Sequence, residues 1–502
     1  MERLSGVLMH ISSLPNQYGI GSFGQAAYDF VDFLKETKQS YWQILPLTTT
    51  SYGDSPYQSF SAFAGNTYFI DLDQLLAEGL LVPEDLAGID FGRKPDDVDY
   101  GLIFQSRQAI LQKAVDRFLG QARPADYETF IQEKAEWLEP FAEYMAIKES
   151  FGLASWMEWD QDIQTRQPQA LDRYRQELAA QMDYHRVTQY WFFKQWQALK
   201  GYANQNHIQI IGDMPIYVAA DSVEMWATPE YFKTDAQGRP TVVAGTPPDD
   251  FSADGQYWGN PIYDWDYMKA NGYQWWVKRI QASFELYDRV RIDHFRGFES
   301  YWEVPFGSPS SAHGYWVKGP GYDLFRVLKE KLGDLDIIAE DLGFMTPEVH
   351  AMREATGFPS MKILQFGFNG HNDSTDLPHH YFWNTAVYVG THDNETAMGW
   401  WNDTASQAQK DQLVTYLHKL PNETPAQALN RGLAQSVSRL AVYTMQDLLS
   451  LGNEARMNEP STIGKNWKWR MTPDQLNQSV TDFLKNITEV YFRSNPKLTE
   501  KE

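Results

Sequence analysis

The sequence contains no cysteine, which excludes disulfides, thiolate metal sites and cysteine nucleophiles. No stretch approaches the roughly 18 consecutive apolar residues of a membrane-spanning helix, so we expect no membrane contact. The opening segment, MERLSGVLMHISSLPN, lacks a long apolar core and a small-residue cleavage site. We therefore expect no signal peptide and a cytoplasmic protein. A basic stripe is also missing and the net charge is −23, which argues against a nucleic-acid partner.

What the chain has is length and aromatic side chains. Its 502 residues allow about three ordinary domains, or one (β/α)₈ barrel carrying insertions. The hydrophobic content of 43% is that of an ordinary globular protein. The 18 Trp, 28 Tyr and 28 Phe supply flat faces that can stack on sugar rings, although we expect most of them in the core.

Short apolar runs that end in polar or Gly-rich residues recur along the chain, and most are separated by helical patterns. Near-continuous apolar runs are typical of buried parallel strands. The eight runs cover residues 4–13, 41–47, 208–218, 290–295, 336–343, 361–368, 386–393 and 439–449. They predict an α/β fold, a (β/α)₈ TIM barrel, whose catalytic groups would lie at the carboxyl ends of the strands.

One connection is too long for a β/α loop, because 160 residues separate the second and third runs. Amphipathic patterns within it indicate helices. We predict that residues 1–54 form strands 1 and 2 of the barrel and that residues 55–200 form a mostly helical inserted subdomain. Residues 201–502 would complete the barrel and include a lid loop at 246–261, with further loop insertions around the mouth of the active site.

The segment VRIDHFRGF places two basic groups and a carboxylate among apolar residues. Strand alternation puts Arg291 and Asp293 on one face. A salt-bridged structural strand would explain this. Alternatively, Arg291 lowers the pKa of Asp293 and keeps it ionised, as a nucleophile must be.

Two further acids at predicted strand ends, Glu340 and Asp393, complete a set of three candidate catalytic carboxylates with Asp293. Glu340 shares a strand face with Ile338 in an apolar setting, where burial would raise its pKa and suit it as a general acid. Asp393 could hold sugar hydroxyls and stabilise positive charge. Each acid alone is a weak signal, because aspartate also caps helices. Together they match a retaining glycosidase.

Several segments resemble the 4-α-glucanotransferase (amylomaltase, disproportionating enzyme) family, which is related to the α-amylases. They occur in family order and span nearly the whole chain. They are GVLMHISSLP, YWQILPLTTTSYGDSPYQSFSAFAGN, IIGDMPIYVA, VAGTPPDDFSADGQYWGNPIYDW, VRIDHFRGFESYWEVP, IIAEDLG, GTHDNET and RMNEPSTIGKNWKWR.

The resemblance implies roles for individual residues and no cofactor. Asp293 would be the nucleophile, Glu340 the acid/base and Asp393 the stabiliser of the transition state. The implied substrate-binding residues are Tyr57, Asp213, Asp249, Phe251, Trp258, Arg291, His294, His392 and Asn466. Tyr52 and Tyr100 would form a second glucan site.

Two aromatic-rich loops also have a simpler interpretation as solvated loops. Residues 48–66 carry closely spaced aromatic rings, which favours sugar contact. In residues 246–261, Phe251 and Trp258 would be platforms on a mobile lid. The sequence departs from the family at Asp250, where tyrosine is frequent, and at Ser461, where glycine is usual. His379 and His380 have no third ligand at metal spacing, so we predict no metal site.

Three functions compete on this basis. A transferase would pass a glucanosyl unit from Asp293 to the 4-hydroxyl of another sugar in maltooligosaccharides, amylose or other α-1,4-glucans. An α-1,4-glucan hydrolase would use the same covalent step with water as acceptor. A non-catalytic glucan-binding barrel would not need all three carboxylates and ranks last. The sequence therefore predicts the transferase, through the resemblance, with the hydrolase as the alternative.

Overall fold

Eight parallel strands form the centre of the molecule. The computed structural model describes residues 2–51, 53–248, 254–371 and 374–499. The strands are β1 (Leu4–Leu8), β2 (Tyr41–Gln43), β3 (Gln209–Met214), β6 (Arg289–Ile292), β9 (Ile337–Ala339), β10 (Ser360–Ile363), β11 (Thr385–Tyr388) and β12 (Leu440–Thr444). Their order in the sheet is β10-β11-β12-β1-β2-β3-β6-β9. The amide of Ala339 donates to the carbonyl of Pro359 over 3.1 Å, which links the two edges of the sheet. The predicted (β/α)₈ barrel is confirmed, and each apolar run overlaps one of its strands.

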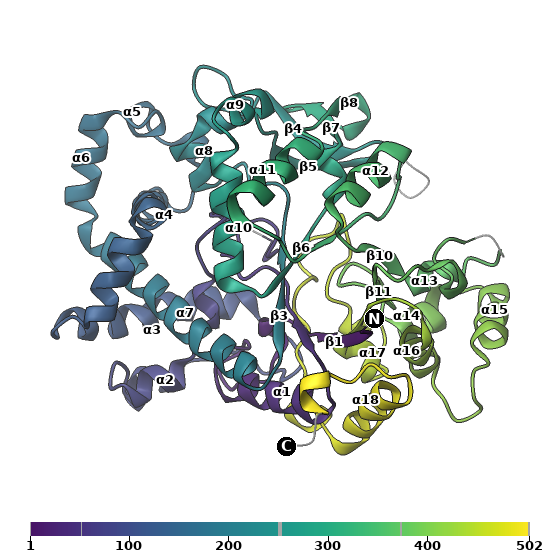
Figure 1. Cartoon of the computed structure of the whole chain (residues 1–502). Coiled ribbons are helices and arrows are strands. Elements are labelled where there is room, and N and C mark those ends of the chain that lie inside the picture. The colour runs from purple at the N-terminus through teal and green to yellow at the C-terminus, as the bar shows by residue number, and fades with distance from the viewer. Residues whose placement is uncertain (1, 52, 249–253, 372–373, 500–502) are drawn as a thin grey trace.

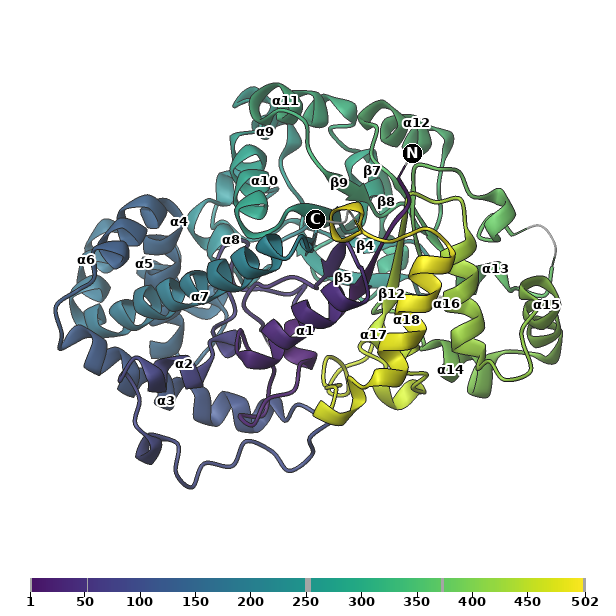
Figure 2. The same ribbon diagram turned by 60° about the horizontal axis from the view of Figure 1, so that its bottom comes forward.

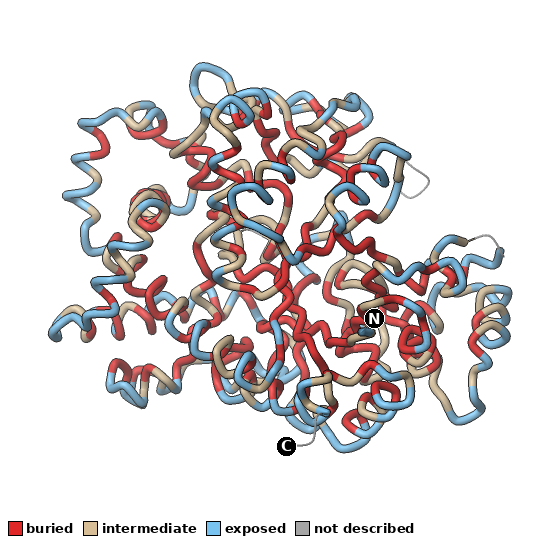
Figure 3. Tube along the Cα trace, viewed as in Figure 1, coloured by how far each residue is buried: buried red, intermediate tan, exposed pale blue. Residues whose placement is uncertain are grey.

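The strands are buried because helices cover them. Every residue of β6, β11 and β12 is buried. Figure 3 shows the buried residues concentrated at the centre and the exposed residues on the surrounding helices. The long helices around the barrel are α1 (Gln25–Glu36), α7 (Ala179–Gln205), α10 (Gln274–Leu286), α11 (Tyr322–Leu332), α12 (Pro347–Thr356), α16 (Pro425–Gln435) and α18 (Gln478–Val490). Shorter or peripheral helices are α8 (Val223–Ala227), α9 (Trp265–Ala270), α13 (Leu364–Gly367), α14 (Ala397–Gly399), α15 (Gln407–Leu417) and α17 (Met445–Leu448).

The long connection between β2 and β3 is helical. It contains α2 (Leu72–Ala77), α3 (Tyr100–Leu119), α4 (Ala125–Ser150), α5 (Gln161–Gln164) and α6 (Pro168–Glu177), and it ends in α7. Figures 1 and 2 show these helices gathered on one side of the barrel. Helix α7 packs against α4 and also against α1 of the barrel. We propose that residues 55–200 form an inserted subdomain and that α7 joins it to the barrel.

A second, antiparallel sheet follows the carboxyl ends of β3 and β6. Its strands are β4 (Val242–Thr246), β5 (Gln256–Pro261), β7 (Ser300–Pro305) and β8 (Tyr315–Lys318), in the order β5-β4-β7-β8. The interpretation of 246–261 as one loop was wrong at its end, because Gln256–Pro261 form strand β5. Gly and Pro in this segment suggested a loop, whereas pairing with β4, itself paired with β7, makes it a strand.

No helix among the described residues is long and apolar enough to cross a membrane.

Candidate active site

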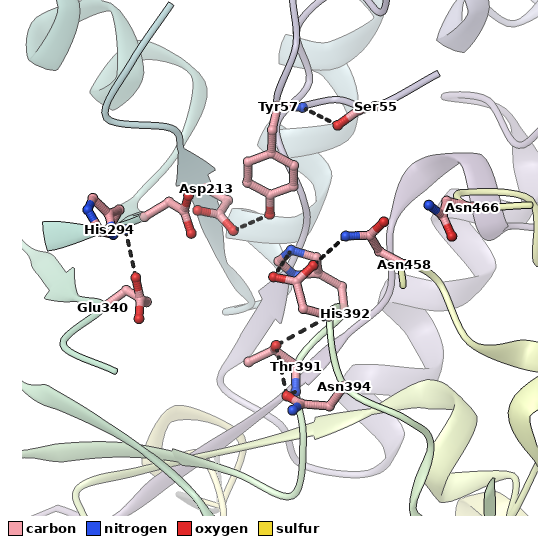
Figure 4. A network of polar contacts seen from close by, with 12 residues as sticks. Ser55, Tyr57, Asp213, His294, Glu340, Thr391, His392, Asn394, Asn458 and Asn466 are labelled. Carbon is pink, nitrogen blue, oxygen red and sulfur yellow. Dashed lines mark hydrogen bonds and ion pairs between the residues drawn. The ribbon is translucent and has the colours of Figure 1, made fainter. Parts of the chain in front are cut away.

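The three predicted catalytic acids follow three barrel strands. Asp293 and Glu340 come directly after β6 and β9, and Asp393 lies in the loop after β11. Because these strands run parallel, their carboxyl ends open at the same mouth of the barrel. Figure 4 shows the surrounding polar side chains, with His294 and Glu340 at one end and Asn458 and Asn466 at the other.

A buried guanidinium ties the nucleophile candidate to its neighbour. Nη1 of Arg291 lies 2.8 and 2.7 Å from the two carboxylate oxygens of Asp213, and its Nη2 lies 3.1 Å from Oδ1 of Asp293. The hydroxyl of Tyr57 also donates to Asp213 over 2.8 Å. Arg291 and Asp213 are only 3% and 2% exposed, so each charge needs the other. The network fixes the position of Asp293 without occupying both of its oxygens.

Burial dominates the ionisation of Asp293. It raises the pKa of Asp293 to about 6, while Arg291 lowers it and the charges of Asp213 and Asp393 raise it further. The expectation that Arg291 would depress the pKa of Asp293 was wrong in its net direction, although Arg291 does oppose the rise. Near neutral pH the carboxylate is still mostly ionised.

Glu340 is held by two backbone amides. Oε2 accepts from the amide of His294 over 2.7 Å, and Oε1 accepts from the amide of Leu342 over 2.9 Å. Burial raises the pKa of Glu340 to about 7, opposed by Arg291 and reinforced by the charge of Asp293. The predicted direction for Glu340 is confirmed. A carboxyl group with this pKa can carry a proton at neutral pH and release it.

His294 shapes the same end of the site. Its backbone is left-handed, with φ +51°, and its amide donates to Glu340. Burial, followed by the charge of Arg296, lowers the pKa of His294 to about 3, so the ring is neutral. The ring of Trp258 meets the imidazole edge to face, with ring centroids 4.8 Å apart. Trp258 therefore reaches the site from β5, as a strand residue.

Asp393 is positioned by a segment distant in sequence. Nδ2 of Asn458 donates to Oδ1 of Asp393 over 2.6 Å, and Nη2 of Arg456 donates to its carbonyl over 2.8 Å. Nε2 of His392 lies 3.3 Å from the other carboxylate oxygen. The ring of His392 stacks on Tyr57 at 5.0 Å. Asn458 and Arg456 were not singled out from the sequence, although both lie in the quoted segment RMNEPSTIGKNWKWR.

The remaining predicted residues do not all reach these acids. The side chain of Asn466 bonds within its own loop, accepting from the amide of Glu459 over 3.0 Å and donating to the carbonyl of Thr462 over 2.9 Å. Tyr100 is buried, and its hydroxyl donates to the carbonyl of Trp467 over 2.9 Å. Tyr52, Asp249, Asp250 and Phe251 lie outside the described residues.

No three metal-binding side chains within the described ranges come together in an arrangement that could hold an ion. Nδ1 of His379 instead contacts the hydroxyl of Tyr416 at 2.8 Å. The candidate catalytic groups of the site are the carboxylates of Asp293, Glu340 and Asp393. An ionised carboxylate beside a carboxyl group that can be protonated supports double displacement at a glycosidic carbon.

Comparison with known proteins gives consistent matches over the whole chain. The family described as 4-alpha-glucanotransferase matches residues 9–477. The 4-alpha-glucanotransferase of Streptococcus pneumoniae serotype 4 is 58% identical over 500 residues, covering 99% of each chain. That of Thermus thermophilus is 46% identical over 487 residues, covering 95% of this chain and 96% of the relative. The structure of an amylomaltase from Streptococcus agalactiae in complex with acarbose superposes with a TM-score of 0.96 at 51% identity, covering 98% of this chain and all of that one.

Proposed function

The chain belongs to the 4-alpha-glucanotransferase family, and from this premise we propose that it disproportionates α-1,4-glucans by a retaining, two-step mechanism. The observation that carries the mechanism is the pairing of Asp293 with Glu340. The first is mostly ionised at neutral pH, and the second, with its pKa raised to about 7, still carries a proton in a large share of molecules.

In the first step the carboxylate of Asp293 attacks the anomeric carbon of a maltooligosaccharide. The bond from that carbon to the leaving sugar breaks, and its electron pair stays on the leaving oxygen. Glu340 supplies the proton which that oxygen takes up. A glucanosyl ester on Asp293 and a shortened sugar result.

In the second step the 4-hydroxyl of another sugar replaces the leaving group. Glu340, now ionised, accepts the hydroxyl proton while the oxygen attacks the anomeric carbon and releases Asp293. Asp393, held by Asn458 and beside His392, stabilises the positive charge that develops on the sugar ring in both steps. Arg291, Asp213 and Tyr57 form the wall of the subsite in which the bond is cleaved.

Transfer rather than hydrolysis depends on holding an acceptor sugar. Water competes at about 55 M, whereas well-oriented groups reach effective molarities of roughly 10⁵–10⁸ M. Even a small part of that advantage favours a bound sugar. We assign acceptor holding to Trp258, whose ring lies against His294 beside Glu340.

Incubation of the purified protein with maltotriose tests the proposal. We expect glucose plus a ladder of longer maltodextrins, with little net gain in reducing ends. Trp258→Ala should raise the share of hydrolysis, because it weakens acceptor binding more than formation of the glucanosyl ester. A steady rise in reducing ends, with no product longer than maltotriose, would leave the hydrolase alternative standing.

A further inference from the structure

A stack of three side chains lies just outside the active site, and none of the functions above uses it. It consists of Trp316 on β8, Arg296 in the 3₁₀ turn Phe295–Phe298, and Phe344 in the loop after β9. The guanidinium carbon of Arg296 lies 4.1 Å from the centroid of the Trp316 ring and 5.9 Å from that of Phe344. We call this group the stacked ledge.

The stacked ledge is rigid at its centre and open at its two rings. Arg296 is 5% exposed, whereas Trp316 is 40% and Phe344 72% exposed. Nη1 of Arg296 donates to the carbonyl of Phe344 over 2.6 Å, and Nη2 donates to Ser300 over 3.0 Å. Trp302 also contacts Trp316 edge to face, with ring centroids 5.3 Å apart. Arg296 and Trp302 therefore hold the Trp316 ring, Arg296 holds the backbone of Phe344, and both rings are presented to solvent.

Core packing does not account for this arrangement. Arg296 forms no ion pair with any described residue. The charge of Glu299, which accepts from the Ser300 hydroxyl over 2.6 Å, opposes the lowering of its pKa by burial, and its Nε has no hydrogen-bond partner among the described residues. Burying a guanidinium in this way is costly. Its guanidinium lies within cation–π distance of both rings, an interaction that arginine makes more often than lysine. Exposed aromatic faces held in place at such a cost are typical of a binding surface.

The position of the stacked ledge indicates what it binds. Arg296 is two residues after His294, whose amide holds Glu340, and Phe344 is four residues after Glu340. Four residues span at most about 14 Å, so Phe344 lies close to the acid. Because Glu340 protonates the leaving oxygen, the departing part of the donor and the incoming acceptor lie on the Glu340 side. Figure 4 places Glu340 at the end of the site away from Asn458 and Asn466.

We propose that the stacked ledge docks the reducing-side part of an α-1,4-glucan chain, beyond the first acceptor sugar, with Trp316 and Phe344 stacking on its sugar rings. This assignment rests on the proposed function. It makes the ledge a determinant of chain length, since a single leaving glucose from maltotriose does not extend past the acid, whereas a longer leaving chain does.

Kinetics with two donor lengths test the proposal in the intact enzyme. We expect Trp316→Ala to lower kcat/KM for maltoheptaose about threefold to tenfold through KM, the loss of one aromatic contact. With glucose as the acceptor, its kcat/KM for maltotriose should stay unchanged, because neither the leaving glucose nor the acceptor extends beyond the first acceptor sugar. Trp316→Phe keeps a flat ring and should restore most of the preference for the longer donor.

Phe344→Ala provides an independent variant, because the ring of Phe344 interacts with the guanidinium of Arg296 and not with Trp316. It should reproduce the length-dependent loss. Phe492→Ala is the matched control, since that ring is 84% exposed and follows α18, far from β8 in Figure 1. Equal losses for both donors, or no loss for maltoheptaose in either variant, would overturn the proposal. If wild-type protein disproportionates maltotriose, such a result refutes the ledge and leaves the proposed function intact.

Discussion

Replacement of Glu340 by glutamine tests its role as the general acid separately from the other contributions to catalysis. In wild-type protein the active form has Asp293 ionised and Glu340 protonated. With pKa values of about 6 and about 7, turnover of maltotriose should peak between these values. It should fall below pH 6 as Asp293 gains a proton, and above pH 7 as Glu340 loses one. Each further pH unit below pH 6 or above pH 7 should lower the turnover rate about tenfold.

Glu340→Gln should lower maltotriose turnover by about 10²–10⁴-fold, the usual contribution of general acid catalysis. A glycosyl fluoride needs no proton on its leaving group, so it should still react with Asp293. With α-maltotriosyl fluoride the variant should therefore show only the acidic limb near pH 6 and stay flat to pH 9.

The measurement is fluoride released in the first turnover, because the second step also needs Glu340 as base. Glutamine offers one acceptor oxygen for the amides of His294 and Leu342, so a local disturbance must be controlled. An unchanged limb near pH 6 shows that the surroundings of Asp293 are intact. If an alkaline limb near pH 7 persists in the variant, a group other than Glu340 is the acid and the assignment fails.

Two further substitutions test the roles that the structure indicates for Asn458 and Ser461. Asn458→Ala removes a 2.6 Å hydrogen bond to the Asp393 carboxylate. It should lower kcat for maltotriose about tenfold to a hundredfold, because hydrogen bonds to charged groups contribute roughly 1.5–3 kcal/mol. An unchanged kcat would contradict this positioning role. Ser461→Gly should raise the midpoint of thermal unfolding by about 1–2 °C, because Ser461 has φ +65°, a backbone conformation that favours glycine. A lower midpoint would show that interactions of the serine side chain compensate for this strain.

Much of the fold was predictable because its signals are local. Apolar runs such as 290–295 and 386–393 are typical of parallel strands in a sheet that is covered on both faces. All eight runs supply barrel strands. Parallel strands then bring the groups at their carboxyl ends to one mouth. Asp293, Glu340 and Asp393 could thus be placed together from their positions toward the carboxyl ends of the runs. Strand β5 was missed, because pairing with β4 rather than composition makes Gln256–Pro261 extended.

The details of the site depended on contacts between distant segments. Tyr57 reaches Asp213 across 156 positions, and Asn458 reaches Asp393 across 65. No spacing in the sequence indicates such pairs, because the intervening chain can fold back in many ways. The stacked ledge likewise joins residues from three separate loops and strands.

The sequence by itself determined which groups stand at the strand ends, and the tertiary structure decided how those groups ionise. The neighbouring Arg291 was visible in the sequence and correctly opposes the rise in the pKa of Asp293. The rise in pKa comes first from burial, and then from the charges of Asp213 on β3 and Asp393 in the loop after β11. Burial is a property of the folded chain, because the water that reaches a carboxylate is excluded by residues far from it in sequence.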